Sequence, residues 1–281
     1  MENYFTLKGG IRMPAIGYGT FKSTDGGDER LIHMALDAGY RLLDTAAFYG
    51  NEEFVGKAVK ESGLGREEIF ITTKVWKTEL GYERTKASVE QSLKRLQTDY
   101  VDLCLIHWPK PEPDTENWKE LDRGSWKALE EFLRQGKARA IGVSNFLPYH
   151  LDALMEEAEI LPAVDQLELH VGYTQEAAVA YCREHGIQVQ AWSPLGRRRV
   201  LEEPAVVRIA AKYGISPAQL LLKYLLAQDI AVIPKSSSME RMKENLDLPD
   251  FEISREDFYF LRCLPQTGWG GEHPDLPRVY F

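Results

Sequence analysis

The strongest constraint on the fold is a regular alternation between short apolar runs and longer amphipathic stretches. We expect strands at residues 15–19, 41–44, 69–74, 101–106, 138–143, 163–167, 188–192 and 231–233. Helical stretches are expected near residues 28–38, 51–62, 82–97, 118–135, 148–159, 175–185, 203–227 and 239–246. Strands that are apolar nearly throughout, each followed by a helix, are typical of a parallel sheet covered by helices. Eight such units in 281 residues predict an α/β fold of the (β/α)8 TIM-barrel type, which typically has about 250 residues.

A β-hairpin is expected before the first of these strands. Tyr4 to Pro14 reads YFTL, KGG and IRMP, and the glycines mark the turn of a hairpin that would close the bottom of the barrel. A doubly wound sheet is the alternative topology, but Gly17-Tyr18-Gly19 is only a fragment of the G-x-G-x-x-G turn of a dinucleotide site. Because no linker or low-complexity tract divides the chain, we expect one domain over residues 1–281, with loops 110–124 and 265–281 reaching the same end of the barrel.

Composition narrows the classes of partner. The chain has 34 basic and 43 acidic residues, a formal charge of −9, and no basic stripe, which argues against a nucleic-acid partner. No window approaches the roughly 18 apolar residues of a membrane span, and the N-terminus has no signal-peptide pattern, so a cytoplasmic protein is expected. The cysteines, Cys104, Cys182 and Cys263, form no CxxC pair and are interpreted as structural. No metal is expected, because the six histidines show no ligand spacing.

Ionisable residues stand at the ends of successive strands. Asp44 ends RLLD, Lys74 ends IFITTK, His107 follows VDLCLI, and Tyr49 lies in the loop after Asp44. In a barrel the carboxyl ends of the strands carry the active site. An ammonium near a tyrosine stabilises phenolate and lowers the pKa of the phenol, and a carboxylate holds that ammonium in place. With an imidazole to orient a carbonyl oxygen, this set suits an aldehyde or ketone that receives hydride.

Each of these residues also has a structural interpretation. An Asp–Lys pair at strand ends is commonly a structural ion pair, and His107 before Trp108-Pro109 fits a hydrogen-bonded core histidine. Their joint placement on three successive strand ends, with Tyr49 between, favours catalysis.

Almost the whole chain resembles the aldo-keto reductases. The matching stretches, in the order the family has them, are LDTAAFYGNEEFVGKAV (43–59), ITTKVW (71–76), LCLIHWP (103–109), IGVSNF (141–146), VDQLELH (164–170), QAWSPLG (190–196) and IPKSSSMERMKEN (233–245). The resemblance implies a (β/α)8 barrel, extended NADPH, and the catalytic tetrad Asp44, Tyr49, Lys74 and His107, with Tyr49 as general acid. It points to the bacterial 2,5-diketo-gluconate and methylglyoxal reductase branch, whose members reduce small carbonyls.

The same resemblance implies a set of cofactor-binding residues. Ser144, Asn145 and Gln166 match residues that bind the nicotinamide carboxamide, although Ser-Asn after a strand also fits a turn or a helix cap. Trp192 stands where the family usually has a stacking tyrosine, and an indole offers the same flat surface. The remaining implied positions are Ser193 and Leu195 after that strand, Lys235, Ser236 and Arg241 at the 2′-phosphate, and Glu244 and Asn245 at the adenine.

Physical chemistry supports the phosphate positions. Lys235 supplies a point charge, Arg241 supplies a planar fork of donors, and SSSMERMKEN reads as a helix start whose dipole favours an anion. We therefore expect NADPH to be preferred over NADH. The run Arg197-Arg198-Arg199 lies in a loop that the family folds over the pyrophosphate, and a solvated charge run is the equal alternative.

The expected substrate pocket is apolar and aromatic. Its candidate residues are Tyr18, Phe21, Phe48, Trp76, Trp108 and Trp269. Such a pocket suits small aldehydes, ketones and quinones. Two other functions stay open: a Schiff-base lyase that uses Lys74 as nucleophile, and a protein that binds cofactor and a partner without turnover. A monomer is expected, since no heptad pattern is present.

Overall fold

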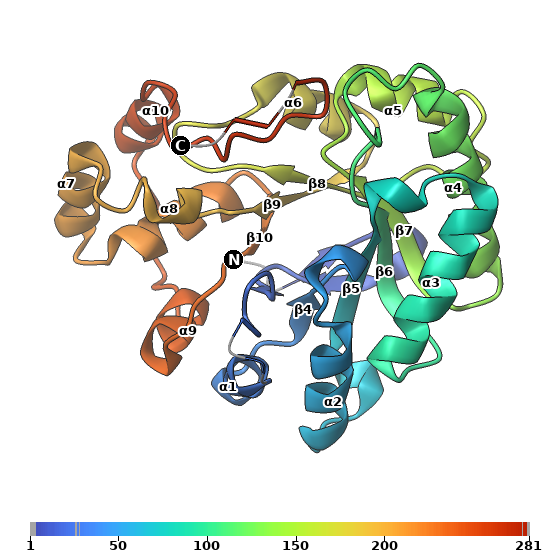
Figure 1. Cartoon of the computed structure of the whole chain (residues 1–281). Coiled ribbons are helices and arrows are strands. Elements are labelled where there is room, and N and C mark those ends of the chain that lie inside the picture. Colours follow the sequence, from blue (N-terminus) through green and yellow to red (C-terminus); the bar gives the residue numbers. More distant parts are fainter. Residues whose placement is uncertain (1–3, 26, 28, 277, 280–281) are drawn as a thin grey trace.

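The expected barrel is present in a computed structural model of the chain, which describes residues 4–25, 27, 29–276 and 278–279. Eight parallel strands follow one another in sequence order in a single sheet, and helices surround it (Figure 1). The strands are β3 (Tyr18–Gly19), β4 (Leu42–Asp44), β5 (Phe70–Val75), β6 (Val101–Ile106), β7 (Ala138–Ser144), β8 (Val164–Glu168), β9 (Gln188–Trp192) and β10 (Ala231–Ile233). Each lies within one of the expected apolar runs or extends one residue beyond its end, so the predicted strand order is confirmed.

A short seam joins the first and the last strand of this sheet. The Gly17 N–H donates to the Val232 carbonyl at 2.8 Å, and the Val232 N–H donates to the Ala15 carbonyl at 2.9 Å. The backbones approach closely at Gly19, where a Cβ atom would stand 2.9 Å from the carbonyl oxygen of Ile233. The seam therefore brings the two edges of the sheet together with few hydrogen bonds, and it depends on a residue without a side chain.

The N-terminal hairpin lies at the bottom of the barrel, as expected. Strands β1 (Tyr4–Thr6) and β2 (Arg12–Pro14) pair antiparallel. Leu7 and Met13 are buried in one apolar cluster with residues from the barrel strands. The strand residues of that cluster include Leu42, Phe70, Leu103, Val164 and Ala231, most of them near the amino ends of their strands. The opposite, carboxyl end of the barrel is left for the site.

The helices follow the expected pattern with two differences. They are α1 (Arg30–Ala38), α2 (Glu52–Glu61), α3 (Tyr82–Leu96), α4 (Trp118–Arg134), α5 (Pro148–Met155), α6 (Glu176–Glu184), α7 (Pro204–Tyr213), α8 (Pro217–Leu226), α9 (Met239–Leu246) and α10 (Arg255–Arg262). The stretch 203–227, expected as one helix, is two, because Gly214 ends α7 at a φ of 66° and Ser216 caps α8. Helix α10, capped by Ser254, was not expected. Residue 28, where the first helix was expected to begin, lies outside the described residues.

After α10 the chain returns across the carboxyl end of the barrel. The Thr267 N–H donates to the Gly172 carbonyl at 3.0 Å, which places the tail beside the loop before α6 (Figure 1). Farther on, Asp275 accepts hydrogen bonds from Lys110 at 2.5 Å and from Tyr149. The loops after β6 and α10 therefore do meet at one end, although residues 277, 280 and 281 of the expected tail lie outside the described part.

Candidate active site

A buried ion pair forms the floor of the site. Lys74 on β5 and Asp44 at the end of β4 lie on neighbouring strands, and Lys74 Nζ lies 2.5 Å from Asp44 Oδ1. Lys74 also donates to the Thr45 carbonyl at 3.0 Å, while Gln166 Nε2 donates to Asp44 Oδ2 at 2.7 Å. Neither side chain is more than 2% exposed. A buried pair is tolerated only when its remaining hydrogen-bonding capacity is also used, and here it is.

The charge of Lys74 is secured by its neighbours. Burial lowers the pKa of Lys74, but the Asp44 carboxylate and the Tyr49 hydroxyl outweigh burial and raise that pKa above its usual value. Lys74 is therefore an ammonium at neutral pH.

Tyr49 contacts the lysine of this pair. It ends the short 3-10 helix Ala47–Tyr49 after β4, and Lys74 Nζ donates to the Tyr49 hydroxyl at 3.3 Å. Desolvation raises the pKa of Tyr49, and the Lys74 ammonium acts in the opposite direction. The pKa of Tyr49 is therefore raised overall. The sequence-based prediction of a lowered pKa is wrong, because the effect of burial exceeds that of Lys74. The phenol is protonated at neutral pH and is therefore an available proton donor.

His107 completes the group. It follows β6, is 8% exposed, and its ring meets the ring of Tyr49 edge to face at 5.6 Å between centroids. Burial, reinforced by the Lys74 ammonium, holds the pKa of His107 well below its usual value. The imidazole is therefore neutral, and one of its nitrogens can donate a hydrogen bond to an oxygen. The structure thus brings together all four residues that the sequence predicts as catalytic.

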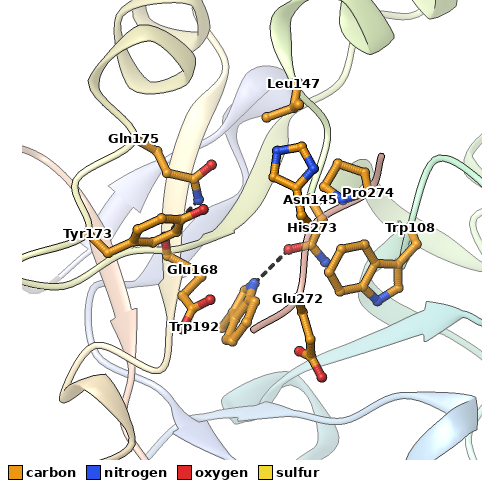
Figure 2. A pocket seen from close by; sticks show the side chains of 10 residues that line it. All are labelled: Trp108, Asn145, Leu147, Glu168, Tyr173, Gln175, Trp192, Glu272, His273 and Pro274. Carbon is orange, nitrogen blue, oxygen red and sulfur yellow. Dashed lines mark hydrogen bonds between the residues drawn. The ribbon is translucent and has the colours of Figure 1, made fainter. Parts of the chain in front are cut away.

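The expected carboxamide residues converge beside the tetrad. Asn145 follows β7 with a φ of 63°, and its Nδ2 donates to the His107 carbonyl at 2.9 Å. Ser144 donates to the Gln166 carbonyl at 2.7 Å. Trp192 is half-buried, and its Nε1 donates to Asn145 Oδ1 at 2.9 Å, the dashed line in Figure 2. These contacts tie the ends of β7, β8 and β9 into one polar patch.

The expected 2′-phosphate residues lie at the start of α9. Lys235 and Arg241 are exposed, and neither forms an ion pair with any residue that the structure describes. Ser238 precedes α9 without a side-chain cap. Two unpaired cations beside an uncapped helix start form a suitable place for a phosphate. Of the other expected residues, Ser236 and Asn245 are buried, whereas Ser193, Leu195 and Glu244 are half-buried.

Comparison with known proteins identifies the family. The model of the "Aldo/keto reductase family" matches residues 15–262. The chain belongs to the aldo-keto reductase family. It is 45% identical over 276 residues to the glyoxal reductase of Bacillus subtilis, covering 98% of this chain and 97% of that protein. It is 38% identical over 271 residues to the methylglyoxal reductase of Escherichia coli, covering 96% of each.

Solved structures of the family have the same fold. An aldo-keto reductase of Brucella melitensis, 40% identical, aligns with a TM-score of 0.86 over 92% of this chain and 98% of its own. A Bombyx mori aldo-keto reductase solved in complex with NADP, 34% identical, aligns with a TM-score of 0.84 over 92% of this chain and 91% of its own.

Three of the expected aromatic residues surround the tetrad of this aldo-keto reductase. Phe48 stacks on Trp76 at 3.8 Å between ring centroids, Phe21 lies 5.0 Å from Tyr49, and Trp76 meets His107 edge to face at 5.0 Å. Phe21 and Phe48 are exposed. They leave an aromatic rim around the proton donor.

The other aromatic residues are placed differently. Trp108 lines the pocket of Figure 2 together with Asn145 and Trp192. Trp269, in the tail, stacks on Tyr173 in the loop before α6, at 6.3 Å between ring centroids. Tyr18 is a correction, because it is fully buried and its hydroxyl donates to the Ser236 carbonyl at 2.8 Å. It belongs to the core beside the segment that follows β10, and not to the rim.

Other residues of the site were not expected from the sequence. The pocket of Figure 2 is also lined by Leu147, Glu168, Tyr173, Gln175, Glu272, His273 and Pro274. Arg197, one candidate for the pyrophosphate, pairs instead with Glu272 of the tail at 3.0 Å and lies 5.5 Å from the ring centre of Trp192. Glu168 could have been noticed as a charge within an apolar strand. The tail residues carry no such signal, because their place in the pocket depends on the path of the chain from α10 across the carboxyl end of the barrel.

A cluster of metal-ligand type lies elsewhere in the described structure. Glu29, directly before α1, stands close to His33 on α1 and Glu61 at the end of α2. Glu29 is already paired with Lys57 at 2.6 Å. None of these three residues lines the pocket of Figure 2.

Proposed function

We propose that this aldo-keto reductase uses NADPH to reduce aldehydes and ketones to alcohols, with Tyr49 as the general acid. The observation that carries the proposal is the contact of Asp44, Lys74, Tyr49 and His107 at the carboxyl end of the barrel. Two relatives, a glyoxal reductase and a methylglyoxal reductase, favour small dicarbonyl compounds as substrates. Keto sugars and aromatic aldehydes fit the same aromatic rim.

Each catalytic residue has a defined task. NADPH, when bound, supplies a hydride. His107 is neutral and donates a hydrogen bond that orients the carbonyl oxygen near the Tyr49 hydroxyl. Tyr49 gives its proton to that oxygen as charge develops there, and the Lys74 ammonium, 3.3 Å away, stabilises the phenolate left behind. Asp44 keeps Lys74 in place through their 2.5 Å contact.

The residues present fit NADPH. Asn145, Gln166 and Ser144 offer amide and hydroxyl groups for the carboxamide, and Trp192 offers a flat surface for the ring. Lys235 and Arg241, both exposed and unpaired among the described residues, would hold the 2′-phosphate at the start of α9. Ser193 and Leu195 would border the cofactor after β9, with Ser236, Glu244 and Asn245 at its adenosine end.

The sequence alternatives are less well supported. A Schiff-base lyase needs a neutral lysine as nucleophile, whereas the contacts of Lys74 raise its pKa. A protein that only binds the cofactor and a partner would not need a proton donor such as Tyr49, which here contacts Lys74. We further propose that the chain acts as one domain, as a monomer and in the cytoplasm. No helix in the described part of the chain is both long and apolar enough to cross a membrane.

The test is NADPH consumption by the purified protein with methylglyoxal and 4-nitrobenzaldehyde. Tyr49→Phe should reduce turnover about 100- to 10,000-fold, the usual contribution of a general acid, while NADPH binding persists. Tyr259→Phe, which removes an exposed hydroxyl on α10, is the matched control and should turn over normally. Turnover in Tyr49→Phe within tenfold of the wild type would exclude this proton donor.

A further inference from the structure

The last part of the chain crosses the pocket as a strap. We use this name for residues 267–276, all of which the structure describes. Three residues of the strap line the pocket of Figure 2: Glu272, His273 and Pro274. That pocket adjoins the tetrad, because Asn145 lines it and also donates to the His107 carbonyl at 2.9 Å. The position of the strap therefore helps to set the shape of the space beside the tetrad.

The amino end of the strap is held through its backbone. The Thr267 N–H donates to the Gly172 carbonyl at 3.0 Å. A Cβ atom on Gly268 would stand 2.9 Å from His170 Cε1, so the strap backbone lies close against a buried side chain at this point. This end of the strap therefore packs directly on the barrel.

The carboxyl end of the strap is held by the side chain of Asp275. It accepts hydrogen bonds from Lys110, at 2.5 Å, and from the Tyr149 hydroxyl. Burial raises the pKa of Asp275, but the hydrogen bonds from Lys110 and Tyr149 act in the opposite direction, and the pKa is lowered overall. Asp275 is therefore a carboxylate at neutral pH. We call Lys110, Tyr149 and Asp275 the clasp.

The clasp joins three segments that are distant in the sequence. Lys110 lies after β6, Tyr149 lies on α5, and Asp275 lies on the strap. Each of these segments also supplies a pocket-lining residue within two positions of its clasp residue, namely Trp108, Leu147 and Pro274. Because so little chain separates the clasp from these residues, the clasp holds three walls of the pocket together.

The clasp is partly shielded from water. The Lys110 side chain is 10% exposed and the Asp275 side chain 27%. Lys110 Nζ also lies over the rings of Trp118 and Tyr149, at 5.1 and 5.5 Å from their centroids. His150 Nε2 lies 3.6 Å from Asp275 Oδ1, but burial lowers the pKa of His150 to about 3, so Lys110 is the cation of the clasp. A shielded pair is screened less by salt than a pair on the open surface.

We propose that Asp275 is a positioning residue for the substrate pocket: by binding Lys110 and Tyr149 it keeps the strap closed over the carbonyl compound. The inference rests on the proposed function. Asp275 acts through the walls of the pocket and not on the reacting atoms, so hydride and proton transfer stay with NADPH and the tetrad. Loss of the clasp should therefore weaken substrate binding and leave the chemical step unchanged.

The size of the effect follows from the share of molecules in which the strap is closed. A hydrogen bond to a charged group is strong enough to shift such an equilibrium about tenfold or more. When only the closed form binds substrate, the apparent dissociation constant rises in inverse proportion to the share of that form. We expect Asp275→Asn, which removes the counter-charge of Lys110, to be mostly open. It should raise KM for methylglyoxal about tenfold and keep kcat within about threefold of the wild type.

The experiment measures kcat and KM for methylglyoxal at saturating NADPH. The variants are Asp275→Asn, Lys110→Met, their combination and the control Asp152→Asn. Asp152 on α5 also accepts from a tyrosine hydroxyl, that of Tyr181, in an exposed contact, so its variant should keep the wild-type KM. Since the clasp needs both partners, the double variant should have a KM close to that of either single variant. An unchanged KM in Asp275→Asn, a loss that falls mainly on kcat, or single effects that multiply in the double variant would overturn the inference.

Proteolysis gives a readout that does not depend on turnover. Glu272 precedes His273 in the strap, so a glutamate-specific protease can release residues 273–281, and intact-mass measurement follows that release. Release should be faster from Asp275→Asn than from the wild type or Asp152→Asn, because an open strap is more accessible. Equal rates in Asp275→Asn and the wild type would contradict a strap that the clasp holds closed.

The two proposals fail in different ways. A wild type that reduces no carbonyl compound with NADPH refutes the proposed function, and the rates of proteolysis then still test the clasp. A wild type that is active, with no change of KM in Asp275→Asn, refutes only the role of Asp275.

Discussion

Asp44→Asn should destabilise the protein far more than an isosteric change usually does. Asp44 is 2% exposed and accepts hydrogen bonds from Lys74 and Gln166. Asparagine keeps the shape and one acceptor but removes the charge. The Lys74 ammonium, fully buried, is then left without its counter-ion.

Breaking a buried pair from one side destabilises by about 3 to 5 kcal/mol. We expect about 3 kcal/mol for Asp44→Asn, because one hydrogen bond to Lys74 is retained. For a chain of this size that corresponds to a melting temperature roughly 6 to 12 °C lower. The loss should shrink as the pH rises toward 10, because an unpaired buried ammonium has a lowered pKa and can release its proton.

Urea unfolding at pH 7 and pH 9 measures this effect, with Lys74→Met and the double variant completing a thermodynamic cycle. The double variant contains no stranded ammonium, so it should be more stable than Asp44→Asn alone. The reasoning is refuted if Asp44→Asn lies within 1 kcal/mol of the wild type at pH 7, or if the double variant shows the sum of the two single losses.

Three further predictions concern other groups. Burial and Lys74 hold the pKa of His107 low, so the unfolded chain binds this proton more readily and stability falls as the pH drops below about 6.5. His107→Gln should flatten the stability curve between pH 5 and pH 7, as measured by urea unfolding. Burial raises the pKa of Asp122, whose oxygens lack hydrogen-bond partners among the described residues, so its contribution weakens as the pH rises above about 4. Asp122→Asn should therefore stabilise more at pH 8 than at pH 5, and equal melting shifts at both values would contradict this. Arg241→Ala should weaken NADPH binding about tenfold or more and NADH binding little; equal losses in a fluorescence titration would exclude a 2′-phosphate contact.

The fold was largely predictable because a short run that is apolar nearly throughout is typical of a strand buried on both faces of a parallel sheet. VDLCLI and IFITTK leave no polar face, and both became central strands. Helix limits were harder to predict. The apolar spacing continues through residues 203–227, and only Gly214 and the Ser216-Pro217 cap reveal the break.

The site was predictable where an ionisable residue stands at the end of an apolar strand, as Lys74 and His107 do. It was less so where packing decides. An aromatic residue at a strand end suits either the core or the rim, and Tyr18 proved to be buried. The sign of a pKa shift likewise depends on burial, which for Tyr49 exceeds the effect of Lys74. Glu272 could not be predicted, since its place beside Arg197 depends on the return of the tail.

The seam between β3 and β10 has a consequence for synthesis on the ribosome. Residues 15–19 pair with residues 232–234, so the partner of the first barrel strand emerges more than 200 residues later. At about 5 to 20 residues per second, that is a delay of roughly 10 to 40 s. During this time the outer edge of β3 has no native strand beside it, and an open edge is a template for pairing with other chains. The two-residue length of β3 and the glycines around it, Gly17 and Gly19, keep that waiting edge short. The shortest strand of the barrel therefore exposes few unpaired backbone groups while the rest of the chain is being synthesised.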